Sequence, residues 1–215
     1  TISQDTKNYA AMVSMVDREV GNVLDLLREL GLEDNTIVFF TGDNGGQDRF
    51  KSKEHPRGFF GPNVNPETGV EFRGGKGNLY EGGLKIPFLV RWPGVVAANT
   101  VRDLVFYQPD MMATIADLTN TKATEDTDGI SIAPTLLGAD GSQKLHEMMY
   151  WEFGNQIAVR YGKWKAIQPG KPKGSKKNQP WELYDLSRDV SESTSVADSH
   201  PDVLEKMQVF ADASH

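Results

Sequence analysis

Two glycine-rich motifs hold the residues best suited to chemistry in this chain. The first is the run Thr41–Gly46 (TGDNGG), in which the Asp43 carboxylate stands beside the Asn44 amide. Two hard oxygen ligands of this kind suit calcium or magnesium rather than zinc. The second motif centres on Lys76, which has glycines on both sides. Its ammonium group can approach a tetrahedral oxyanion such as sulfate or phosphate, because no neighbouring side chains obstruct it.

Each motif also has a simpler interpretation. Asp-Asn-Gly is common turn chemistry, and a lysine among glycines can lie on a flexible surface loop with its charge in water. Two familiar phosphate-binding patterns are absent. The chain lacks the P-loop frame Gly-x-x-x-x-Gly-Lys-Ser/Thr, and no Gly-x-Gly-x-x-Gly follows the apolar run Ile37–Phe40.

The elements around the first motif predict an α/β unit. The apolar run Ile37–Phe40 suits a strand that is buried on both faces, and Asp43 follows its carboxyl end, where ligands bind in open α/β sheets. Residues 9–30 predict an amphipathic helix before this strand, ended by Gly31. Its apolar residues recur every three or four positions and are expected to face the core: Met12, Val16, Val20, Val23, Leu27 and Leu30.

Three segments together resemble the formylglycine-dependent sulfatases. They are Thr41–Gly45 (TGDNG), Gly75–Gly83 (GKGNLYEGG) and Ile86–Gly94 (IPFLVRWPG), and they occur here in the family's order and spacing. The similarity extends over nearly the whole chain, but only to the C-terminal half of such an enzyme. No one of these motifs is specific alone, whereas their combination is.

The resemblance implies an alkaline-phosphatase-like α/β fold and hydrolysis of sulfate esters, with a carbohydrate or glycan as the expected substrate.

 The family's roles map onto Asp43 and Asn44 as calcium ligands and onto Lys76 as the catalytic contact to the sulfate group. The long polar loop Gln47–Glu71 matches the segment that rims the substrate pocket in these enzymes, so His55 and Arg57 are expected to contact substrate. The simpler interpretation of the loop is that both side chains are merely solvated.

The sulfatase nucleophile is expected to lie outside this chain. The family makes formylglycine from the Cys or Ser of a Cys/Ser-x-Pro-x-Arg motif, but the chain has no cysteine, and none of its 11 prolines stands in that frame. The nearest match, Ser199-His-Pro-Asp, has Val203 in place of the arginine. The chain also begins at Thr1 without a methionine, which suggests a piece of a longer polypeptide. Formylglycine and the remaining calcium ligands are therefore expected in an N-terminal half.

The pattern changes after a turn-rich stretch at residues 138–145. We expect residues 1–140 to belong to the α/β catalytic domain and residues 141–215 to form a small C-terminal subdomain. Before that boundary, a strand is predicted at 84–92, a short strand or extended piece at 103–107 and a helix at 109–118, with Met111, Met112, Ile115 and Leu118 towards the core. After it, four short strands at 148–153, 157–161, 163–167 and 181–186 predict an antiparallel sheet, and residues 201–213 predict a final helix.

Composition limits the partners. The net charge of −7 gives no indication of nucleic-acid binding, and no apolar run is long enough to span a membrane. The resemblance implies a sulfated small molecule or glycan as substrate, the N-terminal half as partner, and a periplasmic or secreted location. The six lysines of the segment Lys163–Lys177 can attract a polyanionic glycan, although a solvated loop explains them better. Core packing likewise explains the tryptophans of the short strands better than sugar stacking does.

Two alternative functions remain open. A phosphatase or phosphodiesterase on the same fold would favour zinc and several histidine ligands, and the four histidines show no ligand spacing. A non-catalytic fragment that binds anionic glycan is the second alternative.

Overall fold

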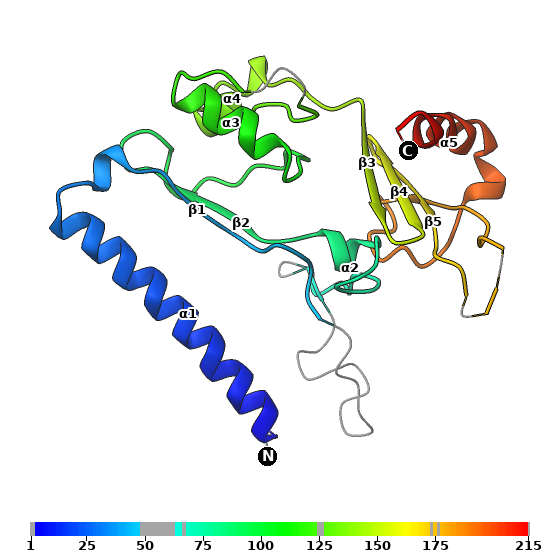
Figure 1. The fold of residues 1–215 in the computed structure, drawn as a ribbon, viewed down its shortest axis with the longest axis horizontal. Coiled ribbons are helices and arrows are strands. Elements are labelled where there is room, and N and C mark those ends of the chain that lie inside the picture. Colours follow the sequence, from blue (N-terminus) through cyan, green and yellow to red (C-terminus); the bar gives the residue numbers. More distant parts are fainter. Residues whose placement is uncertain are drawn as a thin grey trace. The chain divides into compact units, whose positions relative to one another are not determined.

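The computed structural model describes residues 3–47, 63–65, 68–123, 127–172, 174–175 and 177–214. They belong to two compact units (Figure 1). One unit comprises Thr1–Met15, Thr41–Pro87 and Glu147–His215, and the other comprises Val16–Phe40 and Phe88–His146. The two glycine-rich motifs therefore share a unit with the C-terminal strands. The boundary expected near residue 140 stays a prediction.

The first unit contains a four-stranded antiparallel sheet. Its order is β3 (Met148–Phe153), β4 (Gln156–Tyr161), β5 (Trp164–Gln168) and β6 (Glu182–Asp185). The four predicted strands and their antiparallel pairing are confirmed, because short segments of β-branched and aromatic residues separated by tight turns specify hairpins locally. The helix α5 (Pro201–Ser214) follows, also as predicted.

The sheet has two differently covered faces, since successive residues of a strand point to opposite sides. On one face Val159, Ala166 and Leu183 pack with Met207 of α5 in a buried cluster. On the other, Ala158, Ile167 and Tyr184 form a second cluster with Leu79, which lies in the glycine-rich segment. Trp164 and Trp181 pack against the first cluster and Trp151 against the second, so the expectation of core packing is confirmed.

The second unit contains a two-stranded sheet and short helices. Strand β1 (Val38–Thr41) pairs with β2 (Phe88–Arg91), and the ring centroids of Phe39 and Phe88 are 5.8 Å apart. The helices are α3 (Asp110–Leu118) and α4 (Ala133–Leu136). The predicted strand at 84–92 is shorter than expected: its first residue ends α2 (Glu81–Leu84), and β2 comprises only Phe88–Arg91. No strand is assigned at residues 103–107, which the structure describes fully.

A buried carboxylate organises the start of α3. Asp110 is fully buried, and its carboxylate accepts hydrogen bonds from the backbone N–H groups of Tyr107 and Ile130 at 2.9 and 2.7 Å. The imidazole of His146 lies 2.7 Å from the same carboxylate. The partner of His146 is therefore Asp110, a structural residue that also binds the backbone at Tyr107 and Ile130.

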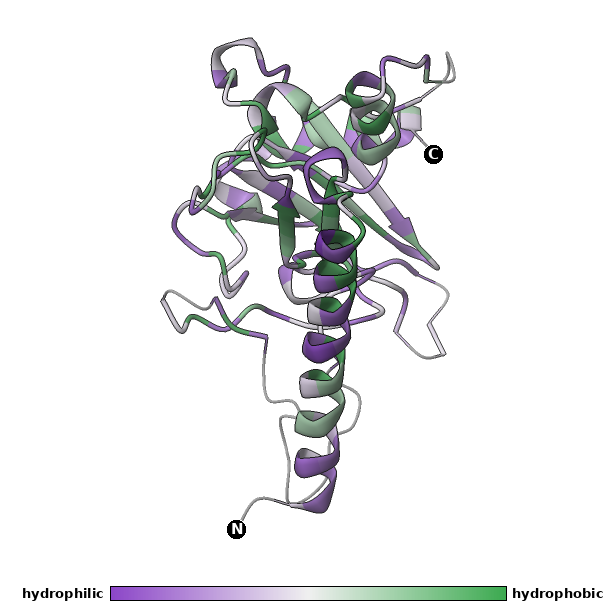
Figure 2. Cartoon of the chain, turned by 90° about the vertical axis from the view of Figure 1, so that its left-hand side faces the viewer, coloured by the Kyte–Doolittle hydropathy of each residue, from purple (hydrophilic) through white to green (hydrophobic). Residues whose placement is uncertain are grey.

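The long helix α1 (Gln4–Glu29) is present, but the expected burial of its apolar stripe is wrong for this structure. None of its described residues is buried, and Met12, Val16 and Val23 are more than half exposed. Figure 2 shows apolar and polar residues alternating along it. Met112 and Ile115 of α3 are exposed in the same way, and Phe40 of β1 is not buried. Burial of an apolar side chain needs a surface that covers it, and these side chains stay largely exposed in the described residues.

Among the described residues, no helix is long and apolar enough to cross a membrane.

Candidate functional site

The two glycine-rich motifs, separated by about thirty residues of sequence, are joined through their backbones. The Gly45 N–H donates to the Gly83 carbonyl at 2.9 Å, and the Lys76 N–H donates to the Gly46 carbonyl at 2.8 Å. A third connection comes from the side chain of Asn63, whose amide donates to the Gly82 carbonyl at 2.8 Å. The segment after β1 and the turn that carries Lys76 therefore form one structure.

Glycines permit this close approach. A Cβ atom at Gly45 would lie 2.0 Å from the Gly82 carbonyl oxygen, and one at Gly82 would lie 2.2 Å from the Gly74 carbonyl oxygen. Both distances are far shorter than any ordinary contact, so a side chain at Gly45 would force the two motifs apart and one at Gly82 would distort the Lys76 turn itself. Gly74 and Gly77, on either side of Lys76, have φ angles of +73° and +97°, which glycine adopts without strain.

Asn44 and Lys76, two of the predicted site residues, both interact with the third, Asp43. Asp43 and Asn44 are exposed, whereas Lys76 is half-buried. The pKa of the Asp43 carboxyl lies below its usual value, first because the Asn44 side chain donates a hydrogen bond to it and then because of the Lys76 charge. Asp43 is thus ionised at neutral pH. Because the Asn44 amide nitrogen is the donor, its carbonyl oxygen remains an acceptor.

The donor chemistry of this pair fits calcium, but the number of ligands does not complete a site. An ionised carboxylate and an amide oxygen are hard donors, while calcium takes about six to eight oxygens. Within the described ranges, no group of three or more histidine, cysteine, aspartate or glutamate side chains is placed to hold a metal ion. His55 and Arg57, the other two predicted contacts, lie outside the described residues.

A buried ion cluster adjoins the Lys76 turn, and the sequence alone did not reveal it. The ammonium group of Lys165 on β5 lies 2.8 Å from the Glu81 carboxylate and 2.9 Å from the Glu192 carboxylate. The side chains of Lys165 and Glu192 are 1% and 0% exposed. The Glu192 carboxylate also accepts a 2.6 Å hydrogen bond from the backbone N–H of Glu81. We call these three residues the ion triad.

The two carboxylates of the ion triad are not equivalent. Burial raises the pKa of Glu192, more strongly than the charge of Lys165 lowers it. Burial would also raise the pKa of Glu81, but the charge and hydrogen bond of Lys165 bring it below the usual value. Two buried carboxylates share one ammonium group, so Lys165 is the counter-charge on which both depend.

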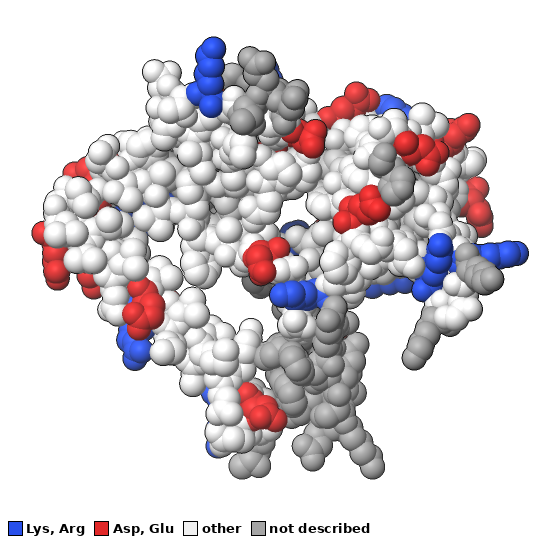
Figure 3. Space-filling model, in the orientation of Figure 1, with Lys and Arg blue, Asp and Glu red and all other residues white. Residues whose placement is uncertain are grey.

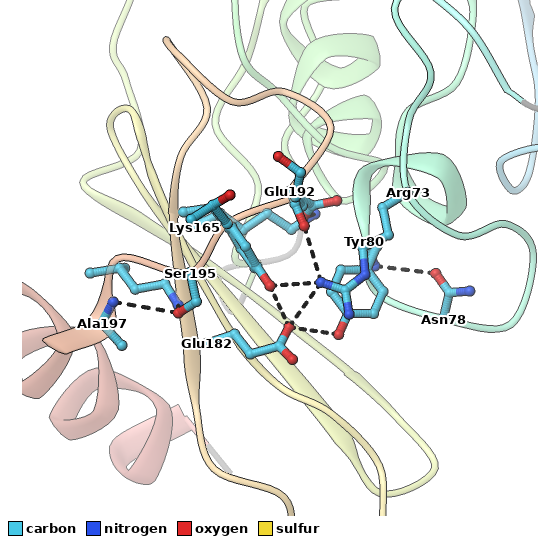
Figure 4. Close-up of polar contacts among 12 residues, drawn as sticks. Arg73, Asn78, Tyr80, Lys165, Glu182, Glu192, Ser195 and Ala197 are labelled. Carbon is cyan, nitrogen blue, oxygen red and sulfur yellow. Dashed lines mark hydrogen bonds and ion pairs between the residues drawn. The ribbon is translucent and has the colours of Figure 1, made fainter.

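Arg73, just before the Lys76 turn, joins the same region to the sheet (Figure 4). Its guanidinium donates to the Tyr184 hydroxyl at 2.7 Å and to the backbone carbonyl of Glu192 at 3.0 Å. It also lies over the Tyr80 ring, 3.9 Å from the centroid. The hydroxyls of Tyr80 and Tyr184 both donate to the Glu182 carboxylate, at 2.7 and 2.6 Å. The turn is thereby fixed to β6 and to the loop that follows it.

The lysine-rich segment is not uniformly a solvated loop, because Lys165 is buried and Lys163 pairs with Asp185 at 2.7 Å. Lys165 stands two positions from Ile167 and shares its face of β5, but Lys165, Ala166 and Ile167 are all buried, so no alternation along the strand marked the lysine as buried. Figure 3 shows acidic side chains dispersed over several parts of the visible face and several Lys and Arg side chains along its lower right.

Two family models match the chain. The model described as Sulfatase matches residues 2–121. The model described as N-sulphoglucosamine sulphohydrolase, C-terminal, matches residues 74–209. Their overlap contains the Lys76 turn, and together they span both units.

Curated relatives carry sulfatase names. An N-acetylgalactosamine-6-O-sulfatase of Bacteroides thetaiotaomicron is 34% identical over 209 residues, covering 91% of this chain and 39% of the relative. Human arylsulfatase A is 30% identical over 217 residues, covering 90% of this chain and 40% of the relative. The chain therefore spans about two fifths of the length of these relatives.

Solved structures agree with the sequence comparison. A Bacteroides thetaiotaomicron structure described with the metabolism of multiple glycosaminoglycans has a TM-score of 0.73 and 31% identity, covering 93% of this chain and 42% of that one. The crystal structure of Ps i-CgsB in complex with k-i-k-neocarrahexaose has a TM-score of 0.73 and 28% identity, covering 95% and 42%. The fold is thus the alkaline-phosphatase-like α/β fold, with a small antiparallel sheet and a C-terminal helix.

Proposed function

Because this chain belongs to the sulfatase family, we propose that it is the C-terminal part of a calcium-dependent enzyme that hydrolyses sulfate esters of carbohydrates. The observation that carries the proposal is the pair of backbone hydrogen bonds that join the two motifs. They place Lys76 near enough to Asp43 for its charge to lower the pKa of the Asp43 carboxyl. A cation-binding pair and an anion-binding lysine in one structure are suited to stabilising the negatively charged oxygens of a sulfuryl group while its ester is hydrolysed.

In this proposal Asp43, Asn44 and Lys76 have separate roles. Asp43 and Asn44 would hold the calcium ion through one carboxylate and one amide oxygen. Bound calcium would stabilise negative charge on the sulfuryl oxygens. The Lys76 ammonium group donates a charge-assisted hydrogen bond to a sulfate oxygen, and the flanking glycines leave room for the substrate to approach. The absence of bulky groups at Gly74, Gly75 and Gly77 makes this contact sterically possible.

The remaining catalytic groups belong, in this proposal, to an N-terminal half. The chain has no cysteine and no Cys/Ser-x-Pro-x-Arg sequence, so a formylglycine nucleophile would be supplied by that half together with the other calcium ligands. His55 and Arg57 remain proposed substrate contacts. A periplasmic or secreted location also remains part of the proposal.

The names of the relatives indicate the substrate class to test. One is an N-acetylgalactosamine-6-O-sulfatase, and one structural neighbour is a complex with a neocarrahexaose. The test is release of sulfate from N-acetylgalactosamine 6-sulfate and from carrageenan oligosaccharides by the full-length protein, with calcium and after its chelation. Calcium-dependent release from either substrate supports the proposal. Hydrolysis of phosphate esters with stoichiometric zinc, and no sulfate release, would instead support a phosphatase.

The two alternatives gain no support from the described residues. The described histidines are engaged elsewhere: His146 lies against Asp110, and the His200 ring lies 4.7 Å from the ring of Trp164. For a glycan-binding fragment, Lys165 of the lysine-rich segment is buried, so it cannot contact a glycan at the surface. Glycan binding without calcium and without turnover would still establish that alternative.

A further inference from the structure

We infer that Glu192 is a positioning residue that holds both ends of the Lys76 turn and thereby sets the position of the Lys76 ammonium group. The inference rests on the proposed function, in which Lys76 contacts sulfate. It assigns a role in the reaction to a loop residue that is more than a hundred positions from Lys76 in sequence.

One end of the turn is held through the backbone of Glu192. Its carbonyl oxygen accepts a 3.0 Å hydrogen bond from the guanidinium of Arg73, the residue that precedes Gly74. Arg73 cannot move away without also losing its bond to the Tyr184 hydroxyl and its stacking over Tyr80. The Arg73 carbonyl, in turn, accepts a 2.8 Å bond from the Gly82 N–H, which closes the turn on itself.

The other end is held through the side chain of Glu192. One carboxylate oxygen accepts the 2.6 Å bond from the Glu81 N–H, and the other lies 2.9 Å from the Lys165 ammonium, which also binds the Glu81 side chain. Lys76 lies between Arg73 and Glu81, so one residue fixes the two ends of the segment that carries it.

The backbone of Glu192 shows that this arrangement outweighs a local preference. Its φ angle is +52°, a left-handed conformation that a glutamate rarely adopts. Its side chain is fully buried although a carboxylate strongly prefers water. The contacts to Arg73, Glu81 and Lys165 offset these costs. A charge retained in such a place is expected where geometry matters.

The test compares Glu192→Gly with Glu192→Ala in the full-length protein. Glycine relieves the left-handed strain and alanine does not, while both remove the carboxylate. Positioning predicts that kcat/KM for sulfate release falls about 10- to 100-fold in both variants, although the glycine variant has the higher Tm. A purely structural role predicts that activity follows Tm, with the glycine variant close to wild type. Glu147→Gly, which removes an exposed carboxylate of the same unit, is the control expected to keep wild-type kcat/KM.

A double-mutant cycle separates the inference from the proposed function. If Glu192 acts through Lys76, then Glu192→Gly has no further effect on kcat/KM once Lys76 is alanine. An undiminished further loss in that background overturns the inference. If Lys76→Ala lowers kcat/KM while Glu192→Gly leaves it unchanged, only the positioning role fails. If Lys76→Ala has no effect, the proposed function fails and the inference fails with it. Should both Glu192 variants fail to fold, Arg73→Gln, which removes the contact at the other end, is put through the same cycle with the same expectations.

Discussion

The ion triad allows a quantitative prediction about stability, tested by Lys165→Met. Methionine has a similar length and fits a buried site, so the change removes chiefly the charge. It leaves the carboxylates of Glu81 and Glu192 buried without a counter-charge. The control is Lys163→Met, the same substitution two positions earlier, where the lysine pairs with Asp185.

The magnitude follows from distance and burial. At separations of 2.8 and 2.9 Å, each attraction is worth about 6 kcal/mol for an effective dielectric constant of about 20, before the desolvation cost is subtracted. Removing one partner of a buried pair costs about 3–5 kcal/mol. The Lys163 side chain is 47% exposed, so its loss should cost less than about 1 kcal/mol. The two variants should therefore differ by about 3 kcal/mol.

Urea denaturation of the full-length protein measures the difference. With a slope of about 2 kcal/mol per molar urea, the midpoint of Lys165→Met should lie about 1.5 M below that of Lys163→Met. Adding Glu192→Gln to Lys165→Met should recover part of the loss, because a single buried carboxylate then remains unpaired. Equal midpoints for the two lysine variants would refute the claim that the ion triad stabilises this unit.

Three further predictions concern the junction, a surface ion pair and the cation pair. Gly82→Ala places a Cβ atom 2.2 Å from the Gly74 carbonyl oxygen and should destabilise the protein by about 1–3 kcal/mol in urea denaturation, whereas Gly141→Ala, which meets nothing within 4 Å, should not. Hydrogen bonds from Lys163 and Ser187 lower the pKa of Asp185 to about 2. The stability that the ionised Asp185 adds to the folded protein is therefore complete above about pH 4 and is lost as the pH falls towards about 2. Unfolding measured over this pH range should show the loss in wild type and not in Asp185→Asn. Calcium should raise the Tm of the full-length protein and chelation should lower it, with a smaller response in Asp43→Asn; an unchanged response would remove Asp43 from the proposed ligands.

Much of the local structure was predictable from the sequence. The antiparallel strands and α5 were predicted within one or two residues, because alternation and turn residues act over a few positions. The exposure of the α1 stripe and of Met112 was not predicted. Periodicity identifies an apolar face but not the surface that covers it, and this chain spans about two fifths of the length of its relatives.

The candidate site was predictable in its residue types and not in its support. Asp43, Asn44 and Lys76 stand in short motifs whose chemistry can be read locally. The bond between Lys165 and Glu81 joins residues 84 positions apart, and no local pattern specifies such a pair. The lysine was therefore grouped with its basic neighbours. Glu192 gave no signal, since its left-handed backbone appears only in the folded chain.

The most direct test of the account is the kinetic effect of Lys76→Ala on sulfate release by the full-length protein, with the exposed Lys171→Ala as control. If Lys76 stabilises the charge on the sulfuryl group, kcat should fall about 100- to 1000-fold in the first variant and stay at the wild-type value in the second. An unchanged kcat/KM in Lys76→Ala would contradict the assignment of this turn to the sulfate site.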